Sequence, residues 1–487
     1  MAYDDLNQWI ATLEKEDQLS RVSTKVDWNL EIGGILQENF DRKGPALLFE
    51  NIKDYEHTWC RKLFTASLST YPRIALALGL PKETKPEEIV KAYRERVKKP
   101  VKPVTVDAGP VKENKLFGAD VDISGLPAPK WHHLDGGRFV GTCDGVVTKD
   151  PETGWVNIGL YRRMMHDRNH TGLVVVHGQH IWRHWRSHKK LGFKTMPVAV
   201  VNGWVPVLPF IACSPQPPFV CEYDIMGAIR QKPVELVKCE TVDLEVPASA
   251  QIVYEGEVSL DYDTFKMEGP FGEYCGYYQR EASPKPVFEI NCITHRTDPI
   301  YQGTLEGVPV NEDHMMESVS FSALIWNYLN ENVIGVTGVN ADPSTAWANV
   351  IVQVDNSYVG QVFQVASLIW GWDKSNFVGK NVMVVDQDID IYDLSKVMWA
   401  WAYRVDPKRD YHFFPGLYGA SDPVITETER IGKTVYLGTK MLIDATKWIG
   451  QPRTKAMWGE RFPPTAHPDK ETMEKVRNRW QEYGIKA

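Results

Sequence analysis

Two glutamates stand close together in an irregular segment near the middle of the chain. Glu268 and Glu273 flank Gly269-Pro270 and Gly272, residues that enforce a tight backbone path. Two carboxylates held near each other repel, so one of them can stay protonated near neutral pH and act as a general acid. The same pattern is also compatible with two solvated carboxylates in a turn, because acids in loops are usually exposed.

An apolar, strand-like segment upstream carries Asn157 and Arg162 at its end. Their spacing of five places them on opposite faces of a regular strand, so a bend must intervene if they act together. An arginine here can clamp a carboxylate or phosphate with two parallel hydrogen bonds. The alternative is an arginine on an edge strand that faces water.

Eight of the 13 histidines fall between residues 132 and 188, which favours a metal or acid/base role. His180, His184 and His188 share one face of a predicted helix, a geometry that can bind metal. Basic residues interleave with the last two, so we interpret His184 and His188 as part of a solvated basic face. His180 differs because it lies where the loop enters the helix.

Asp386, Asp388 and Asp390 alternate directly after a predicted buried strand and resemble a site for a hard cation. The alternative is a strand end with one acid capping the following helix. No GxGxxG, GxxxxGK[ST], GxSxG or HExxH motif occurs, so the common nucleotide-binding and hydrolase signatures are absent.

Composition narrows the class of protein. The 487 residues are 43% hydrophobic and 24% charged, as in a soluble globular chain of about three domains. The net charge of −8 gives no reason to expect nucleic acid as a partner. Seven scattered cysteines without a CxxC pair argue against a zinc ribbon or disulfide framework and favour the cytoplasm. The longest apolar stretch, 196–214, is broken by prolines, so we expect no membrane span, and the acidic amphipathic N-terminus is no signal peptide.

Residue periodicity predicts a mixed α/β unit over 1–115, with a helix starting at Thr84 through a capping box with Glu87. Residues 116–310 carry short β-rich runs between Gly, Pro and Asp turns, typical of a sandwich or barrel-like sheet. Within them, Asn202-Gly203 predicts a tight hairpin.

A helix over 311–330 leads to the last region, 331–487. Strands at 349–355 and 381–386 alternate there with helices at 359–370 and 394–403, which predicts a parallel α/β layer. A charged helix, 470–483, ends the chain.

Together these segments resemble the UbiD family of reversible decarboxylases, which use prenylated FMN. The matching stretches are NIGLYR (157–162), HGQHI (177–181), a long run from EYDIMG to YEGE (222–257), EGPFGEYCGYY (268–278), VVDQDIDIYD (384–393) and RVDPKRD (404–410). The resemblance implies an α+β and α/β multidomain subunit. Its N-terminal α/β domain (1–115) and central split β-barrel (116–310) would bind the flavin, and the linker helix (311–330) would lead to a C-terminal α/β domain (331–487) that dimerises. It also implies a helix where Asn202-Gly203 suggests a hairpin.

The resemblance implies that Asn157, His180 and Glu222 bind Mn²⁺ or Mg²⁺, which bridges to the cofactor phosphate, with K⁺ nearby. It implies that Arg162, Glu268 and Glu273 are catalytic. We expect Arg162, oriented by Glu268, to hold the substrate carboxylate and to leave Glu273 free as the proton donor, with its pKa raised by burial. Further cofactor contacts are expected at Ile158, Leu160, Tyr161, Gln179, Cys213, Pro215 and Lys374, and substrate contacts at Phe414, Pro415 and Gly416.

The implied reaction is reversible, non-oxidative decarboxylation of an aromatic, heteroaromatic or α,β-unsaturated acid, with carboxylation at high CO₂. An acid carried as an aryl-CoA thioester is one alternative. A non-catalytic flavin-binding or assembly subunit is another, although such a relative should have lost a member of the metal or Glu-Arg-Glu set. A hydrolase using the acids at 386–390 is disfavoured, because the resemblance places no metal there. The resemblance further implies a flavin prenyltransferase as cofactor supplier, and a homodimer or a higher oligomer such as a hexamer.

Overall fold

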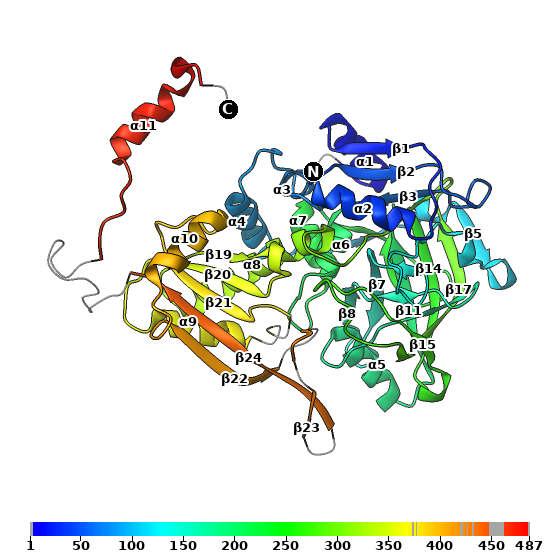
Figure 1. Cartoon of the computed structure of the whole chain (residues 1–487). Coiled ribbons are helices and arrows are strands. Elements are labelled where there is room, and N and C mark those ends of the chain that lie inside the picture. The colour runs from blue at the N-terminus through cyan, green and yellow to red at the C-terminus, as the bar shows by residue number, and fades with distance from the viewer. Residues whose placement is uncertain are drawn as a thin grey trace.

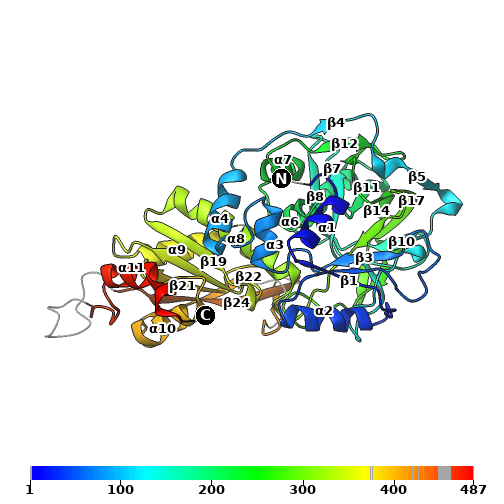
Figure 2. The same ribbon diagram turned by 90° about the horizontal axis from the view of Figure 1, so that it is seen from above.

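The chain was analysed as a computed structural model that describes residues 3–372, 375, 377–418, 422–425, 427–430, 433–447 and 462–485. It is a mixed α/β fold built from several sheets (Figure 1). The N-terminal and central regions form one side of the molecule, and the C-terminal sheet with its helices forms the other side. The same division is visible from above (Figure 2).

The N-terminal region packs helices against a small sheet of order β1-β2-β3-β18. Its elements are α1 (Leu6–Lys15), β1 (Leu19–Val22), α2 (Glu31–Asp41), β2 (Ala46–Phe49), β3 (Lys62–Thr65), α3 (Tyr71–Ala77) and α4 (Pro86–Arg96). The capping box expected at Thr84 and Glu87 is wrong, because Lys85 is the N-cap and no side chain caps the helix. Pro86 at the first helical position, with its preset φ, begins α4 instead.

The central region is built mainly on an antiparallel sheet of order β10-β17-β14-β11-β7-β8, with β5 paired to β17. Its strands are β4 (Val104–Thr105), β5 (Asn114–Phe117), β6 (Phe139–Gly141), β7 (Asp144–Lys149), β8 (Val156–Gly159), β9 (Arg163–Met164), β10 (His170–Gly172), β11 (Thr195–Asn202), β12 (Glu235–Lys238), β13 (Glu245–Pro247), β14 (Ile252–Ser259), β15 (Lys266–Glu268), β16 (Ser283–Lys285), β17 (Val287–His295) and β18 (Ile300–Gln302). Its helices are α5 (His180–Lys190), α6 (Val207–Ala212) and α7 (Glu222–Arg230).

The hairpin expected at Asn202-Gly203 is wrong, since β11 is followed by helix α6. The Asn202 side chain donates to the carbonyl of Gln302 at 2.7 Å and accepts from its N–H at 2.8 Å. The asparagine therefore binds the backbone of β18 instead of closing a turn. Because β18 pairs in parallel with β3, this contact also joins the central region to the N-terminal sheet.

The C-terminal sheet has the order β19-β20-β21-β24-β22, and β23 pairs with β24. Its elements are α8 (Glu312–Asn332), β19 (Val336–Ala341), β20 (Asn349–Val354), α9 (Gln361–Gly371), β21 (Asn381–Asp386), α10 (Leu394–Arg404), β22 (Tyr411–Tyr418), β23 (Glu427–Arg430), β24 (Lys433–Ala445) and α11 (Lys470–Asn478). Strands β20 and β21 are parallel as expected, and β24, which was not predicted from the sequence, continues the parallel order beside β21. Strands β19 and β22 are antiparallel to their neighbours, so the sheet is mixed. The link from β19 to β20 is too short for a crossover helix.

Within the described part of the chain, no helix is long and apolar enough to cross a membrane. Helix α11 has no buried residue and stands apart from the sheet in Figure 1.

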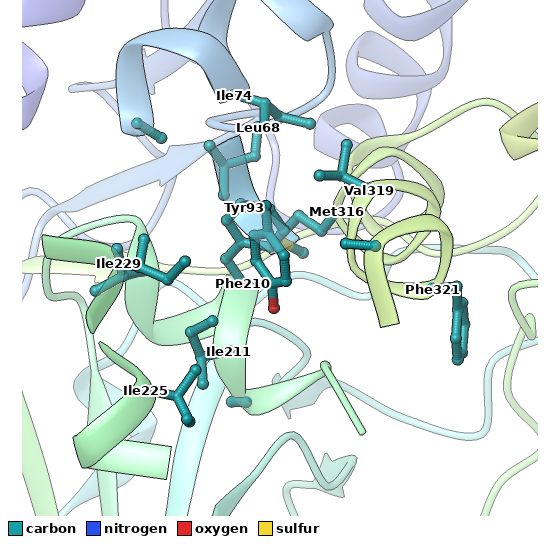
Figure 3. Close-up of a cluster of buried hydrophobic side chains, with 14 of the residues drawn as sticks. Leu68, Ile74, Tyr93, Phe210, Ile211, Ile225, Ile229, Met316, Val319 and Phe321 are labelled. Atoms are coloured by element: carbon teal, nitrogen blue, oxygen red, sulfur yellow. The ribbon is translucent and has the colours of Figure 1, made fainter. Parts of the chain in front are cut away.

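A buried apolar cluster links the regions (Figure 3). Its members come from α3, α4, α6, α7 and α8 and from the segment after β3; they include Leu68, Ile74, Tyr93, Phe210, Ile211, Ile225, Ile229, Met316 and Val319. The rings of Tyr93 and Phe210 lie 5.1 Å apart, and the Tyr93 hydroxyl is 3.0 Å from the Ser214 hydroxyl. Burial of this cluster holds α8 against the central region.

Replacing Phe210 with alanine should lower the free energy of unfolding by about 3–5 kcal/mol, because it leaves a cavity between three helices. Tyr93→Phe, which removes only the hydroxyl contact, should cost about 1 kcal/mol. Chemical denaturation measures both, with Phe117→Ala on the exposed edge of β5 as the control. Equal effects at Phe210 and Phe117 would contradict this account of the core.

Candidate active site

Arg162 lies between two carboxylates. Its Nε donates to Glu268 Oε1 at 3.1 Å, and its Nη1 donates to Glu273 Oε1 at 2.8 Å. The expected bend is present, because β8 ends at Gly159 and β9 begins only at Arg163. The expectation that Arg162 pairs with Glu268 alone is wrong: the guanidinium presents donors in more than one direction and serves both acids.

The trio is withdrawn from water. The Glu268 side chain is fully buried, and the side chains of Arg162 and Glu273 are 17% and 23% exposed. Burial raises the pKa of Glu268, although Arg162 opposes the shift. Burial also acts to lower the pKa of Arg162, but the two carboxylates outweigh it and hold that pKa above its usual value. These residues are neither solvated turn acids nor an arginine in water.

Local structure leaves room for Glu268 at the end of β15. A side chain on Gly172 of β10 would place its Cβ only 1.8 Å from Glu268 Oε2, so the carboxylate keeps this position only while residue 172 is a glycine. Gly269 has φ +98°, which favours glycine and turns the chain away from the strand. The Arg162 guanidinium lies 4.6 Å from the centre of the Phe271 ring, which covers its face.

The loop that carries Glu273 is held by the start of α8. His314 Nε2 donates to the carbonyl of Tyr274 at 2.6 Å, while its Nδ1 accepts from the Asn311 N–H at 3.1 Å. A ring that donates at one nitrogen and accepts at the other is neutral, and burial lowers the pKa of His314 to about 4. Helix α8 thereby positions the segment next to the catalytic candidates.

Asn157, His180 and Glu222 come together from β8 and the first residues of α5 and α7. His180 Nδ1 lies 3.2 Å from Asn157 Oδ1 and 3.9 Å from Glu222 Oε1. All three are buried, and His180 Nε2 has no hydrogen-bond partner within the described part of the chain. Burial raises the pKa of Glu222.

This donor set of one amide oxygen, one imidazole and one carboxylate fits Mn²⁺ or Mg²⁺. The described residues contain no cluster of three or more His, Cys, Asp or Glu side chains of the kind that binds metal, so the asparagine is needed to complete the set. The N-termini of α5 and α7 meet at this place, and helix N-termini favour a phosphate group.

The interpretation of His184 and His188 as solvated is wrong, because both are buried. His184 Nδ1 lies 2.8 Å from the Thr148 hydroxyl, and burial lowers its pKa to about 4. His188 Nδ1 donates to the backbone carbonyl of His184 at 2.9 Å. The basic residues between them take the exposed face, so these histidines are core residues bound to protein atoms.

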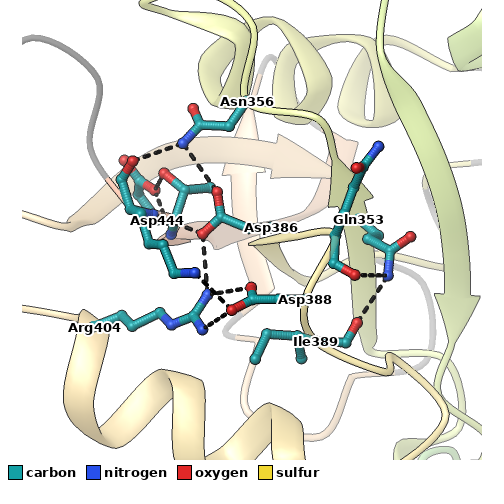
Figure 4. A network of polar contacts seen from close by, with 10 residues as sticks. Gln353, Asn356, Asp386, Asp388, Ile389, Arg404 and Asp444 are labelled. Carbon is teal, nitrogen blue, oxygen red and sulfur yellow. Dashed lines mark hydrogen bonds and ion pairs between the residues drawn. The ribbon is translucent and has the colours of Figure 1, made fainter. Parts of the chain in front are cut away.

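Asp386 and Asp388 form ion pairs instead of a cation site (Figure 4). Arg404 of α10 contacts both carboxylates at 2.8–3.0 Å, and the Lys447 ammonium lies 2.6 Å from Asp388. Asp390 accepts from the Tyr392 N–H at 3.0 Å. The cap of α10 is Asp393, so none of the three acids caps the helix.

One cavity of about 340 Å³ is lined both by the Arg162 trio (Arg162, Glu268 and Glu273) and by the Asn157 group (Asn157, His180 and Glu222). The other residues that were expected to contact the cofactor, and that the structure describes, also line this cavity: Ile158, Leu160, Tyr161, Gln179, Cys213 and Pro215. Lys374 lies outside the described residues. Phe414, Pro415 and Gly416 lie on β22 and are not part of the lining; the Phe414 ring packs on Trp370 at 4.6 Å.

Sequence reasoning missed four acids in the lining, namely Glu281, Glu306, Asp313 and Glu317. The available signal was the spacing of Asp313, Glu317 and Phe321 at four-residue steps, which places them on one face of the predicted helix. Burial raises the pKa of Asp313 to about 7 and holds those of Glu306 and Glu317 well above their usual range, with mutual repulsion adding to each shift.

Three family profiles match this chain. They are the N-terminal domain (residues 10–93), the Rift-related domain (102–309) and the C-terminal domain (314–445) of 3-octaprenyl-4-hydroxybenzoate carboxy-lyase, or UbiD. The pyrrole-2-carboxylic acid decarboxylase of Pseudomonas aeruginosa is 31% identical and aligns over 99% of this chain and 98% of its own length.

Solved structures show the same fold. Vanillic acid decarboxylase of Sedimentibacter hydroxybenzoicus in its closed form superposes with a TM-score of 0.86 at 29% identity and covers 100% of both chains. The UbiD-class enzyme HmfF of Pelotomaculum thermopropionicum, in complex with prFMN, has a TM-score of 0.80 at 28% identity and covers 93% of this chain and 97% of its own.

Gly172→Ala should displace Glu268 and with it the Arg162 guanidinium, because the new methyl group overlaps the carboxylate. We expect turnover to fall at least about tenfold, since misplacement of a catalytic group by about 1 Å can cost far more. Gly34→Ala in α2, where a Cβ meets nothing within 4 Å, is the matched control. Steady-state kinetics would refute the packing argument if both variants kept normal activity.

Asp313→Asn should stabilise the protein above pH 7 and lose this advantage as the pH falls towards 4. The pKa of Asp313 is about 7 in the folded chain and 3.8 ordinarily, so folding takes up a proton between these values. Stability from this group is thus present at low pH and declines as the pH rises through that window. The charged groups facing Asp313 are Glu273, Glu306, Glu312 and Glu317. Thermal unfolding from pH 5 to 8.5 tests this, and a pH-independent difference would contradict it.

Proposed function

The chain belongs to the UbiD family of carboxy-lyases, and we propose that it reversibly decarboxylates an aromatic or heteroaromatic carboxylic acid with prenylated FMN as cofactor. The observation that carries the proposal is Arg162 held between Glu268 and Glu273, in one cavity with Asn157, His180 and Glu222. The relatives named above as acting on pyrrole-2-carboxylic and vanillic acids, and the HmfF complex with prFMN, support the substrate class and the cofactor.

The physical problem of the reaction is an unstable carbanion. Loss of CO₂ from an sp² carbon leaves charge that no side chain can delocalise, and the prenylated flavin supplies the necessary electron sink when it is bound. The protein then has to orient the acid and manage one proton. Arg162 binds the substrate carboxylate through charge-assisted hydrogen bonds, and Glu268 fixes the orientation of its guanidinium.

We assign Glu273 as the group that delivers a proton to the substrate carbon from which CO₂ has left. It is the more exposed of the two acids, while Glu268 is fully buried against Gly172 and remains in place. Its ion pair with Arg162 must open or weaken as the substrate carboxylate arrives, since both anions use the same guanidinium. In the reverse direction the same carboxylate would remove the proton.

Asn157, His180 and Glu222 would hold a divalent metal, Mn²⁺ or Mg²⁺, next to the cofactor phosphate, with K⁺ nearby. A hard cation held by these residues would neutralise the phosphate charge and link the phosphate to the protein. We further propose that a flavin prenyltransferase supplies the cofactor, that the C-terminal region forms a homodimer or larger assembly, and that the enzyme works in the cytoplasm. Lys374 and the segment Phe414–Gly416 are proposed to approach the cofactor and substrate, respectively.

Protein co-expressed with a flavin prenyltransferase should release CO₂ from a member of an aromatic-acid panel, and protein with plain FMN should not. Glu273→Gln keeps the shape and hydrogen bonds of the side chain but cannot pass a proton. It should therefore retain cofactor and bind substrate, yet lose turnover by roughly 10²-fold or more. Deuterium exchange into the product at the reacting carbon should stop as well.

Glu268→Gln is the matched comparison for the proton assignment. It should reduce turnover by disturbing Arg162 while exchange remains measurable. If Glu268→Gln abolishes exchange and Glu273→Gln does not, the two roles are reversed. Full activity with plain FMN would overturn the cofactor.

His180→Ala should lose manganese and flavin together, because one cation links the phosphate to the protein. Asp388→Asn should keep both, since Asp388 is paired with Arg404 and Lys447. Elemental analysis and the flavin absorbance of the purified proteins measure the two contents. The opposite pattern would move the metal site to the acids after β21.

A further inference from the structure

The cavity contains more carboxylates than the proposed reaction uses. Asp313 and Glu317 lie four residues apart on the face of α8 that lines the cavity, and Phe321 continues the same stripe. Glu306 reaches the cavity from the segment between β18 and α8. Elsewhere this helix buries apolar side chains such as Met316 and Val319.

These acids have no side-chain partner among the residues that the structure describes. Asp313 is only 8% exposed, and within the described residues neither it nor Glu306 or Glu317 forms a side-chain hydrogen bond or ion pair. An unpaired buried polar group costs roughly 1–3 kcal/mol, so an apolar residue would make α8 more stable. Only Asp313 is buried to this degree, while Glu306 and Glu317 are half-buried beside it in the same cavity. A buried acid kept at such a cost, facing a cavity, indicates a ligand that supplies the missing hydrogen bonds.

Charge is unevenly distributed along the cavity wall. Arg162, Arg280 and Lys285 line one part of it together with Glu268, Glu273 and Glu281, so this is the part of the wall where cations can bind an anion. Glu306 interacts electrostatically with Arg162 and Glu273, and Glu317 interacts with Asp313 and Glu306. Of the three unpaired acids, Glu306 is thus the one that interacts with Arg162, and Asp313 and Glu317 continue the acidic wall along α8. An aromatic acid with its carboxylate at Arg162 would turn its ring substituents towards them.

The other walls beside the acids are aromatic, with Phe321, Trp347 and Phe377 lining the same cavity. Flat apolar rings suit an aromatic ring, and carboxyl groups suit donors on its edge. A second carboxylate at this place would meet acids instead of cations. Because burial keeps the pKa values of these acids high, a neutral O–H or N–H can be bound without paying for an additional buried charge.

We propose that Glu306, Asp313 and Glu317 are specificity residues that select an aromatic acid with a hydrogen-bond donor on its ring, a phenolic hydroxyl or a ring N–H, and reject an acid with a second anionic group. This inference rests on the proposed function, since it takes the substrate carboxylate to lie at Arg162. It narrows the substrate from aromatic acids in general to those with donor groups opposite the carboxylate.

Three acids of matched shape test the proposal: benzoate, 3,4-dihydroxybenzoate and terephthalate. Their dissociation constants are measured by calorimetry on the Glu273→Gln holoenzyme, which isolates binding from turnover. The dihydroxy acid should bind at least about tenfold more tightly than benzoate, which corresponds to one or more net hydrogen bonds. Terephthalate should bind more weakly than benzoate.

Adding Asp313→Leu or Glu306→Leu should reduce the preference for the dihydroxy acid about tenfold, and the smaller changes Asp313→Asn and Glu306→Gln should improve binding of terephthalate. Glu331→Gln, on the exposed end of α8, is the control and should change neither ratio. Equal affinities for benzoate and the dihydroxy acid, or ratios unaltered in all four variants, would overturn the inference. Absence of CO₂ release by the parent enzyme counts against the proposed function alone, because the binding ratios do not depend on turnover.

Discussion

A buried guanidinium shared by two carboxylates is the constraint around which the site is arranged. Arg162 cannot lose its charge, so its burial requires anions at fixed positions. Glu268 supplies a permanent partner, and Gly172 supplies the space that this carboxylate occupies. Glu273 supplies a second partner that a substrate carboxylate can replace. The two acids therefore compensate the charge of the buried guanidinium. In the proposed reaction, the carboxylate of Glu273 would give up its place beside Arg162 to the substrate carboxylate.

Helix α8 connects this site to the rest of the molecule. Its first residues bind the loop that carries Glu273 through His314, and Glu312 accepts from the Leu68 N–H of the N-terminal region at 2.8 Å. Further along, Ser318 donates to Ala341 of β19 at 2.6 Å. One rigid helix thus touches all three regions of the chain and also lines the cavity.

Three parts of the cavity wall differ in charge and hydrogen-bonding character. Helix N-termini and the Asn157 group suit a phosphate with its metal, and the wall near Arg162 suits a carboxylate. The acidic stripe of α8 suits hydrogen-bond donors. Under the proposals made above, the family chemistry would depend on the first two features and the choice of acid on the third. Substrate preference could then change through α8 without disturbing the residues that hold the cofactor.

Local periodicity was sufficient for the α/β character and for many of the strands and helices. The family resemblance of short motifs named two residue sets, Asn157, His180 and Glu222, and Arg162, Glu268 and Glu273, and the members of each set lie close together in the fold. Their roles stay proposals. Tertiary structure decided features that depend on distant partners. Asn202 binds the backbone of β18 and so forms no hairpin, and burial makes His184 a core residue. Arg162 pairs with both Glu268 and Glu273 because the loop after β15 folds back onto it. The acids of α8 become candidates for ligand binding only because their face of the helix lines a cavity. Contacts between residues a hundred positions apart are set by packing of the whole chain, which no local pattern encodes.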